Sequence, residues 1–197
     1  MPIHQSLNVN AVVEDQAHLE NEAWTRCSFS AVVLAFLEAE WNKWPLLAEH
    51  GDRSLITEPD ITDARQNDAR LSLLRQVRRR LLDHVPANTQ WFEVRHLEVR
   101  HFWALRNIHQ FEWSRFSGTN ELLDMVRVRP EPLRGAPEGW QPILWAHEHV
   151  GPFTILEGNH RLAALANAPA QYRTIRLAAY VGLSPSPCGW HRPDGVW

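Results

Sequence analysis

A short apolar hairpin that runs into a glycine turn and a helix is the feature that most constrains how this chain can fold. Residues 143–146 are apolar, residues 153–156 are apolar except for Thr154, and turn-forming residues separate the two runs. This spacing is typical of a β-hairpin. Residues 157–161 follow the second run directly, and residues 162–166 consist of alanine and leucine, which favour a helix. The sequence therefore predicts a strand, a tight turn and a helix in direct succession.

The turn, Glu157-Gly158-Asn159-His160-Arg161, has the residue types that an anion-binding loop needs. Gly158 lets the backbone turn tightly and lets a ligand approach closely. The backbone N–H groups that follow lie at a helix N-terminus, where the helix dipole favours negative charge. His160 and Arg161 add donors suited to phosphate oxygens. Glu157 ends the strand beside this position, so it is a candidate general base or Mg²⁺ ligand.

Two longer patterns in the first half of the chain predict helices. Apolar residues recur at helical spacing in residues 29–44 and again in residues 61–84. We expect Ser28 or Ser30 to cap the first helix and Pro45 to mark its end.

The remaining segments have weaker or extended patterns. Residues 11–26 form a weak amphipathic helical pattern. Residues 91–102 alternate polar residues with β-branched and aromatic ones and predict a strand. A repeated pentad within them fits no regular strand, so we expect a break near Leu97. Residues 130–142 are rich in proline and predict a loop, and residues 174–182 predict a last strand.

The turn and the order of elements around it resemble the ParB/sulfiredoxin superfamily. Its members end a hairpin strand with a glycine-containing turn, which basic or polar residues and a helix follow. Sulfiredoxins have Gly-Gly-Cys-His-Arg at this place, ParB partition proteins Gly-Glu-Arg-Arg, free-serine kinases Asp-Gly-His-His-Arg and a related nuclease group Asp-Gly-Gln-Gln-Arg-Leu. Residues 157–162, Glu-Gly-Asn-His-Arg-Leu, look most like the last two.

The resemblance extends over residues 90–183 and implies how the chain is organised. It implies an α+β fold in which a ParB/sulfiredoxin-like mixed-sheet domain follows an N-terminal helical region. We expect residues 1–88 to form the N-terminal helical extension and residues 89–183 the α/β domain. Residues 184–197 are expected to form an irregular C-terminal tail.

The resemblance also implies a function and its cofactors. A nucleotide-dependent phosphotransferase or hydrolase that acts on a small molecule would bind ATP or ADP, with Mg²⁺, through residues 158–161. Asn159 stands where sulfiredoxins have their reactive cysteine, and this excludes sulfiredoxin chemistry because asparagine is no nucleophile. ParB proteins carry a helix-turn-helix after this domain, whereas a proline-rich tail follows here. We therefore do not expect partition-type DNA binding.

Four further residues are candidates for the site. The kinases of the superfamily use an acid from their N-terminal region near the acceptor hydroxyl, and Glu93 is the candidate for this catalytic role. Its alternative is an ordinary exposed side chain on a strand. Ser117, Thr119 and Asn120 lie at a predicted helix start and are candidates to bind a second phosphate or a nucleobase edge. Plain helix capping is their alternative role.

Charge bears on two alternative functions. The 197 residues have a net charge of −3, which does not favour non-specific binding to DNA. Residues 75–80 nevertheless hold four arginines, which would follow a nucleic-acid backbone if the protein were a ParB-like nuclease. A solvated helix face is the alternative for these arginines. A non-catalytic module that holds a nucleotide as a regulatory switch is a third function that the sequence leaves open.

Cysteine content and hydropathy predict a cytoplasmic protein with no membrane partner. Cys27 and Cys188 are too few for a disulfide framework, and the N-terminal residues lack the pattern of a signal peptide. The longest apolar stretch, near residues 31–37, is too short to span a bilayer. His147 and His149 have ligand-like spacing but lack a third partner nearby, so we predict no metal site there. The sequence does not indicate the oligomeric state.

Overall fold

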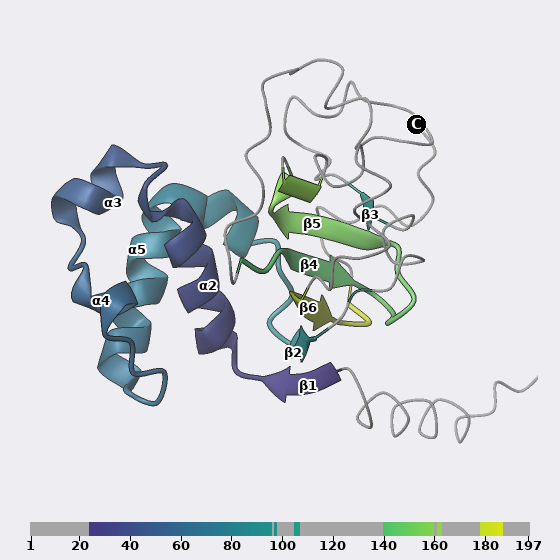
Figure 1. Ribbon diagram of the computed structural model, residues 1–197. Helices are drawn as coiled ribbons and strands as arrows, with labels where there is room; N and C mark the ends of the chain where they lie inside the picture. Colours follow the sequence, from purple (N-terminus) through teal and green to yellow (C-terminus); the bar gives the residue numbers. More distant parts are fainter. Residues whose placement is uncertain are drawn as a thin grey trace, which may run out of the picture.

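The computed structural model describes residues 24–95, 97, 105–106, 140–159, 161–162 and 178–186, and it shows a group of helices beside a mixed sheet (Figure 1). In chain order the elements are β1 (Trp24–Cys27), α2 (Phe29–Trp41), α3 (Pro45–His50), α4 (Ser54–Thr57), α5 (Ala64–Leu82), β2 (Gln90–Val94), β3 (Leu105–Arg106), β4 (Ile143–Ala146), β5 (Phe153–Glu157) and β6 (Ala179–Leu183). None of these helices combines the length and the apolar character needed to cross a membrane.

The described strands form one mixed sheet in the order β1-β2-β6-β4-β5-β3. β1 pairs antiparallel with β2, β2 with β6, and β4 with β5. The pairs β6–β4 and β5–β3 are parallel. β6 comes last in the chain and lies between β2 and β4, so the middle of the sheet joins distant segments. The predicted α+β class with a mixed sheet is confirmed at this level.

α2 and α5 confirm the two strong helical patterns, with shorter bounds than expected. The Ser28 side chain caps α2 by accepting a hydrogen bond from the Ala31 N–H (3.2 Å). α2 ends at Trp41, and Pro45 does not end it but begins α3. Proline fits at that place because the first turn of a helix does not use its own N–H groups.

The helix predicted over residues 11–26 is wrong at its end. Trp24–Cys27 forms β1, an edge strand that pairs with β2, and residues 11–23 lie outside the described residues. The Trp24 ring is buried and packs edge-on against Phe92, with the ring centroids 5.9 Å apart. This contact between strands and the backbone pairing together favour the extended form over the helix.

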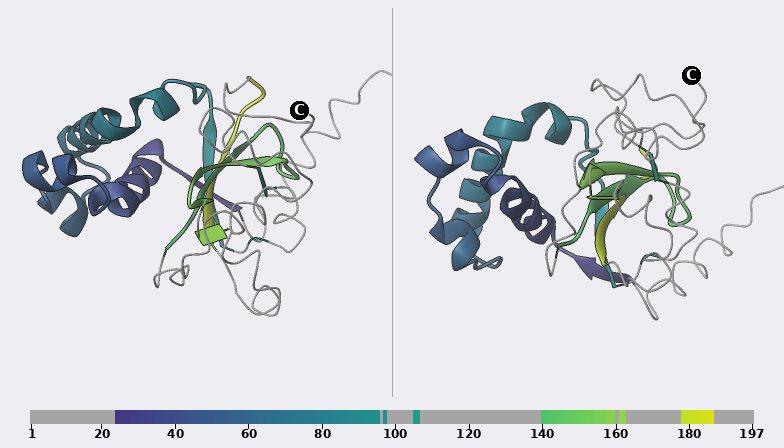
Figure 2. Two further views of the ribbon diagram at one scale, coloured as in Figure 1. Left: turned by 90° about the horizontal axis from the view of Figure 1, so that it is seen from above. Right: turned by 45° about the horizontal axis from the view of Figure 1, so that its top comes forward.

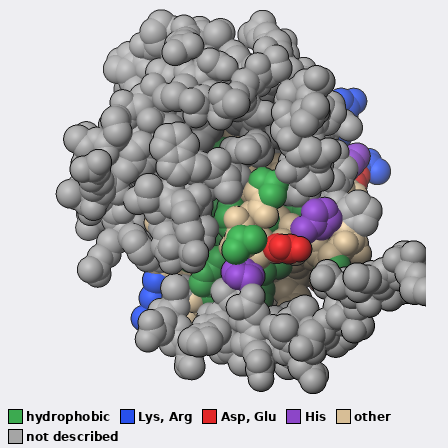
Figure 3. Space-filling view, turned by 90° about the vertical axis from the view of Figure 1, so that its right-hand side faces the viewer, with side chains coloured by type: hydrophobic (Ala, Val, Ile, Leu, Met, Phe, Trp, Pro, Cys, Tyr) green, Lys and Arg blue, Asp and Glu red, His purple; other side chains and the backbone are tan. Residues whose placement is uncertain are grey.

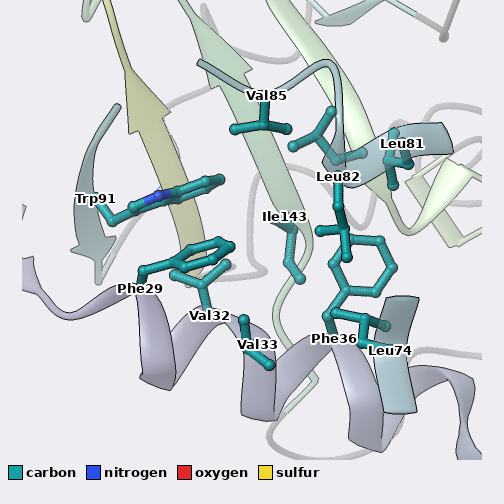
Figure 4. Close-up of a pocket in the computed structure, with 11 residues that line it drawn as sticks. Phe29, Val32, Val33, Phe36, Leu74, Leu81, Leu82, Val85, Trp91 and Ile143 are labelled. Carbon is teal, nitrogen blue, oxygen red and sulfur yellow. The ribbon is translucent and has the colours of Figure 1, made fainter. Parts of the chain in front are cut away.

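The helices lie on one side of the sheet, and an apolar seam joins the two layers (Figure 2). The part of this seam drawn in Figure 4 is lined by Phe29, Val32, Val33, Phe36, Leu74, Leu81, Leu82, Val85, Trp91, Ile143 and Leu156. Phe29 stacks on Trp91, with centroids 5.8 Å apart and planes at 24°. The cavity between these residues has a free volume of about 10 Å³, close to the minimum that one water molecule needs. The apolar seam is therefore packed core, with no room for a ligand.

Candidate functional site

The hairpin and the turn after it lie where the sequence predicts them. β4 and β5 pair antiparallel around residues 147–152, and β5 ends at Glu157. Gly158 has a φ of 102°, and helical conformation begins at Asn159. The Leu162 N–H donates to the Gly158 carbonyl oxygen (2.9 Å). The helical segment therefore begins inside the five-residue turn and not after it, and its course after residue 162 lies outside the described residues.

Gly158 occupies a position that a larger residue does not fit. Its positive φ disfavours any residue with a Cβ atom. A Cβ here would also collide with Cζ2 of Trp140 and would lie 3.3 Å from Cβ of Pro142. The guanidinium of Arg161 lies over the same Trp140 ring, 5.0 Å from its centroid. One tryptophan therefore contacts both the glycine and the arginine of the turn.

Glu157, the acid of the turn, is buried and already accepts hydrogen bonds on both oxygens. It is 5% exposed. Lys43 Nζ donates to Oε1 (3.0 Å), and Trp140 Nε1 donates to Oε2 (3.1 Å). Lys43 follows α2, so this contact joins the helical layer to the last residue of β5. The carboxylate is thus held from both sides, and it is not an exposed group at the edge of the turn.

A second buried carboxylate completes an ion-pair network, a name that we use for Glu40, Lys43, Arg78 and Glu157. Glu40 lies near the end of α2 and is 1% exposed. Lys43 Nζ donates to its Oε1 (3.1 Å), and Arg78 Nη2 donates to its Oε2 (2.7 Å). Trp44 Nε1 also donates to Oε2 (2.5 Å), and the Arg78 guanidinium lies 5.1 Å from the centroid of the Trp44 ring. The network therefore links the end of α2 and the kink of α5 at Arg78 to the end of β5.

The cations of the network hold the pKa of Glu40 below its ordinary value. Burial alone would raise the pKa of this carboxyl, but the hydrogen bond and the charge of Arg78 outweigh burial, with help from Lys43 and Trp44. Glu40 therefore keeps its negative charge although water does not reach it. Loss of either cation would leave that buried charge with fewer partners, which is costly.

Strand pairing brings Glu93 to the same end of the sheet as Glu157. Ile143, the first residue of β4, pairs with Glu157 on β5 and with Tyr180 on β6. Tyr180 pairs in turn with Glu93 on β2. Both acids that the sequence singles out as catalytic candidates therefore lie at one end of the sheet, on strands that are not neighbours.

The segment before β4 binds both of these acids. Trp140 donates to Glu157, and the next residue, Gln141, donates through Nε2 to Glu93 Oε1 (3.4 Å). Two side-chain oxygens at this end of the sheet, Oε1 of Gln141 and Oδ1 of Asn159, are buried with no hydrogen-bond partner among the described residues. Buried acceptors are rarely left unpaired, so each of these oxygens needs a partner other than the described residues.

Glu93 also influences two neighbouring groups that titrate at high pH. Burial raises the pKa of the Cys27 thiol to about 11, and the negative charge of Glu93 adds to the rise. Burial likewise raises the pKa of Tyr180 to about 12, with further contributions from Glu93, Cys27 and Glu38. Cys27 is therefore a protonated, unreactive thiol at neutral pH.

The face opposite the helices carries histidine and acidic side chains close together (Figure 3). His147 follows β4, and its Nδ1 lies 2.9 Å from the carbonyl oxygen of Ser184. Within the described part of the chain, no group of three or more His, Cys, Asp and Glu side chains is arranged to hold a metal ion. The role of Glu157 as a Mg²⁺ ligand therefore stays a prediction.

Four predicted site residues lie outside the described residues: Ser117, Thr119, Asn120 and His160. Their predicted contacts with phosphate or a nucleobase therefore stay predictions.

Sequence reasoning missed Glu40, Lys43 and Trp140. One signal could have found Glu40: it falls on the apolar stripe of its helix, four residues after Phe36. A carboxylate at a position that the pattern buries needs a partner, and Lys43 is three residues away. No comparable signal marks Trp140, because its partners lie on the turn and its own segment has no regular pattern.

Comparison with known proteins adds no relative: no protein-family model, no curated protein and no solved structure matches this chain. The resemblance to the ParB/sulfiredoxin superfamily therefore rests on the turn and on the order of the elements.

Proposed function

We propose that this protein is a nucleotide-dependent phosphotransferase or hydrolase that acts on a small molecule, with the nucleotide phosphates bound at residues 158–161. One observation carries the proposal. Lys43 and Arg161 are both held next to a glycine turn at which a strand passes into a helical segment. Two cations and a row of backbone N–H groups are what phosphate oxygens require.

Arg161 supports the proposal most directly among the predicted residues. Its guanidinium rests on the Trp140 ring and forms no ion pair with the described residues. The donors at the edge of a stacked guanidinium stay open, and they match two phosphate oxygens at once. The positive φ of Gly158 allows a ligand to approach the backbone closely.

The two acids at this end of the sheet supply the proton chemistry under this proposal. A carboxylate has about four acceptor positions, and the two donors on Glu157 leave room for a water, an acceptor hydroxyl or Mg²⁺. Glu93 is the second candidate, on a strand further along the sheet. His160 and Arg161 would stabilise the charge that spreads over the transferred phosphoryl group. The nucleotide would be ATP or ADP, and Mg²⁺ would bind with it.

The hairpin, the glycine turn and the mixed sheet support a ParB/sulfiredoxin-like fold for this site at the level of element order. The kinase-like members of that superfamily have the most similar turn, so we assign the activity to their type. The nuclease alternative loses one arginine of residues 75–80, because Arg78 binds the buried Glu40. The other three remain exposed, Arg79 among them, since its pair with Asp83 (3.4 Å) is a weak surface contact.

A thermal-shift screen of ATP and ADP, with and without Mg²⁺, tests the proposal. A ligand at 100 times its dissociation constant stabilises a protein by about 2.7 kcal/mol, which is easily measured. We expect stabilisation by at least one nucleotide and, with a suitable acceptor or water, conversion of ATP or ADP. Binding without conversion would favour the regulatory module instead. If the melting temperature shifts under none of the four conditions, the proposal is contradicted.

A further inference from the structure

We propose that Lys43 is a phosphate-binding residue of this site, and that Glu40 and Glu157 position its ammonium group. This inference rests on the proposed function of the turn. It adds a residue from the helical layer, 114 residues before Glu157 in the chain, to a site that otherwise belongs to the sheet.

Lys43 is held both at its backbone and at the end of its side chain. Its backbone N–H donates to the carbonyl oxygen of Glu40 (2.9 Å) just after α2 ends. Its Nζ lies 3.1 Å from one buried carboxylate, Glu40, and 3.0 Å from another, Glu157. Both acceptors are almost inaccessible, with side chains 1% and 4% exposed. A lysine normally has many conformations, and these contacts select one.

The ammonium group is nevertheless open to a ligand. The Lys43 side chain is 44% exposed, unlike the two carboxylates that hold it. An ammonium has three N–H donors, and two of them go to the carboxylates. Among the described residues no acceptor takes the third. A lysine held by a glutamate so that it contacts nucleotide phosphates is the arrangement that protein kinases use.

Charge favours an anion at this position. The ion-pair network has two cations and two carboxylates. Arg161 is a third cation, and it lies over the Trp140 ring, which contacts Glu157 of the network. The network itself is therefore neutral in net charge, and Arg161 adds one positive charge at the turn. A phosphate that approached Lys43 and Arg161 would meet both cations, whereas the two carboxylates are covered by their own donors.

The inference changes what is expected of Glu157. If this carboxylate acted only as a nearby negative charge, its neutralisation in Glu157→Gln would relieve repulsion and tighten nucleotide binding. If it positions Lys43, the same substitution frees the lysine and weakens binding. In titrations without Mg²⁺, which Glu157 is also a candidate to bind, the two roles predict changes of opposite sign in the dissociation constant.

Calorimetric titration with ATP and ADP tests the role of Lys43. We expect Lys43→Gln to weaken binding about ten- to a hundredfold, as for the loss of a charge-assisted hydrogen bond, and Lys43→Arg to retain most of the affinity. Arg79→Gln is the matched control: it removes one positive charge from an 80% exposed side chain outside the network, and it should bind like wild type.

The outcomes separate this inference from the proposed function. If wild-type protein binds neither ATP nor ADP, the proposed function fails and the role of Lys43 falls with it. If wild type binds, Arg161→Ala is weakened and Lys43→Gln binds like wild type, only the inference about Lys43 is overturned. Should Lys43→Gln not fold, Glu157→Gln titrated without Mg²⁺ decides: weaker binding supports the inference, and unchanged or tighter binding overturns it.

Discussion

α2 meets the rest of the protein in two different ways along its length. Its first turns contribute Phe29, Val32 and Phe36 to the apolar seam, which is tightly packed (Figure 4). Its end contributes Glu40 to the ion-pair network, although Leu37 and Trp41 beside it still belong to the apolar core. The same helix is therefore docked by the hydrophobic effect along its length, and paired charges are added at its end.

This difference indicates what each end is for. Apolar burial stabilises a fold by roughly 25 cal/mol per Å² and needs no exact partner geometry. A buried ion pair contributes little net stability, because desolvation offsets most of the attraction. Apolar residues in place of the charges could thus stabilise the fold equally well. Under the proposed function the charges serve ligand binding, and the predictions below separate the two ends on that basis.

The largest expected effect is loss of stability from the apolar seam. Phe36 is 3% exposed, and Phe36→Ala should lower the free energy of unfolding by about 3–5 kcal/mol, measured by urea denaturation. The dissociation constant for nucleotide should stay unchanged in the folded fraction. Phe29→Ala is the control, since Phe29 is 39% exposed and should cost less. An equal loss from both variants would contradict the view of the seam as a packed core.

A smaller loss is expected from the ion-pair network. Glu40→Gln leaves Lys43 and Arg78 with a neutral partner, and it should lower the free energy of unfolding by about 1.5–3 kcal/mol at pH 7. Because the folded pKa of Glu40 is lowered, this contribution is present above about pH 4.3 and is lost as pH falls through the folded pKa. The exposed Glu49→Gln should show neither effect. A difference from wild type that does not shrink in acid would argue against a charged Glu40.

The glycine turn should tolerate no larger residue: Gly158→Ala should lower the free energy of unfolding by about 1–3 kcal/mol through backbone strain, and it should displace the Trp140 ring. Nucleotide binding should weaken with it, because Trp140 supports both Glu157 and Arg161. Gly151 provides a matched control at the hairpin, with a positive φ of 83°. Gly151→Ala should introduce similar strain but leave nucleotide binding unchanged. In both variants, binding is followed by the change in tryptophan fluorescence when nucleotide is added. Equal loss of binding in both variants would mean that strain alone, and not Trp140, is responsible.

The smallest expected effect concerns the pKa of Cys27. In a Cys188→Ser background, the rate of thiol alkylation should rise with pH toward a midpoint near 11, well above the ordinary value of about 8.5. The neutral thiol is favoured in the folded state, so its contribution to stability is present below about pH 8.5 and is lost as pH rises toward 11. Glu93→Gln should lower the midpoint, but only partly, because burial is the larger cause. A midpoint near 8.5 would show that Cys27 is open to solvent.

Local patterns predicted the hairpin, the glycine turn and the two main helices because each depends on neighbours in the sequence. β1 was predicted as part of a helix, since its strand form depends on pairing with β2, far along the chain. The hydrogen bond from Lys43 to Glu157 could not be predicted from the sequence, because its partners are also far apart in the chain. Sequence alone therefore identified the turn as a candidate site but not the residues that the helical layer brings to it. The role of Glu157 as a general base or Mg²⁺ ligand stays a prediction, and its hydrogen bonds from Lys43 and Trp140 could not be inferred from the sequence.

The affinity of Arg161→Ala for ATP and ADP tests the central claim, that phosphate binds at the glycine turn, most directly. This guanidinium is held on Trp140 and forms no ion pair with the described residues, so its removal should change binding more than folding. We predict that calorimetry will show a dissociation constant about ten- to a hundredfold higher than that of wild type. Arg80→Ala, on the exposed face of α5, should bind like wild type. Wild-type affinity in Arg161→Ala would contradict the claim and leave the turn as a structural connection between β5 and the helical segment.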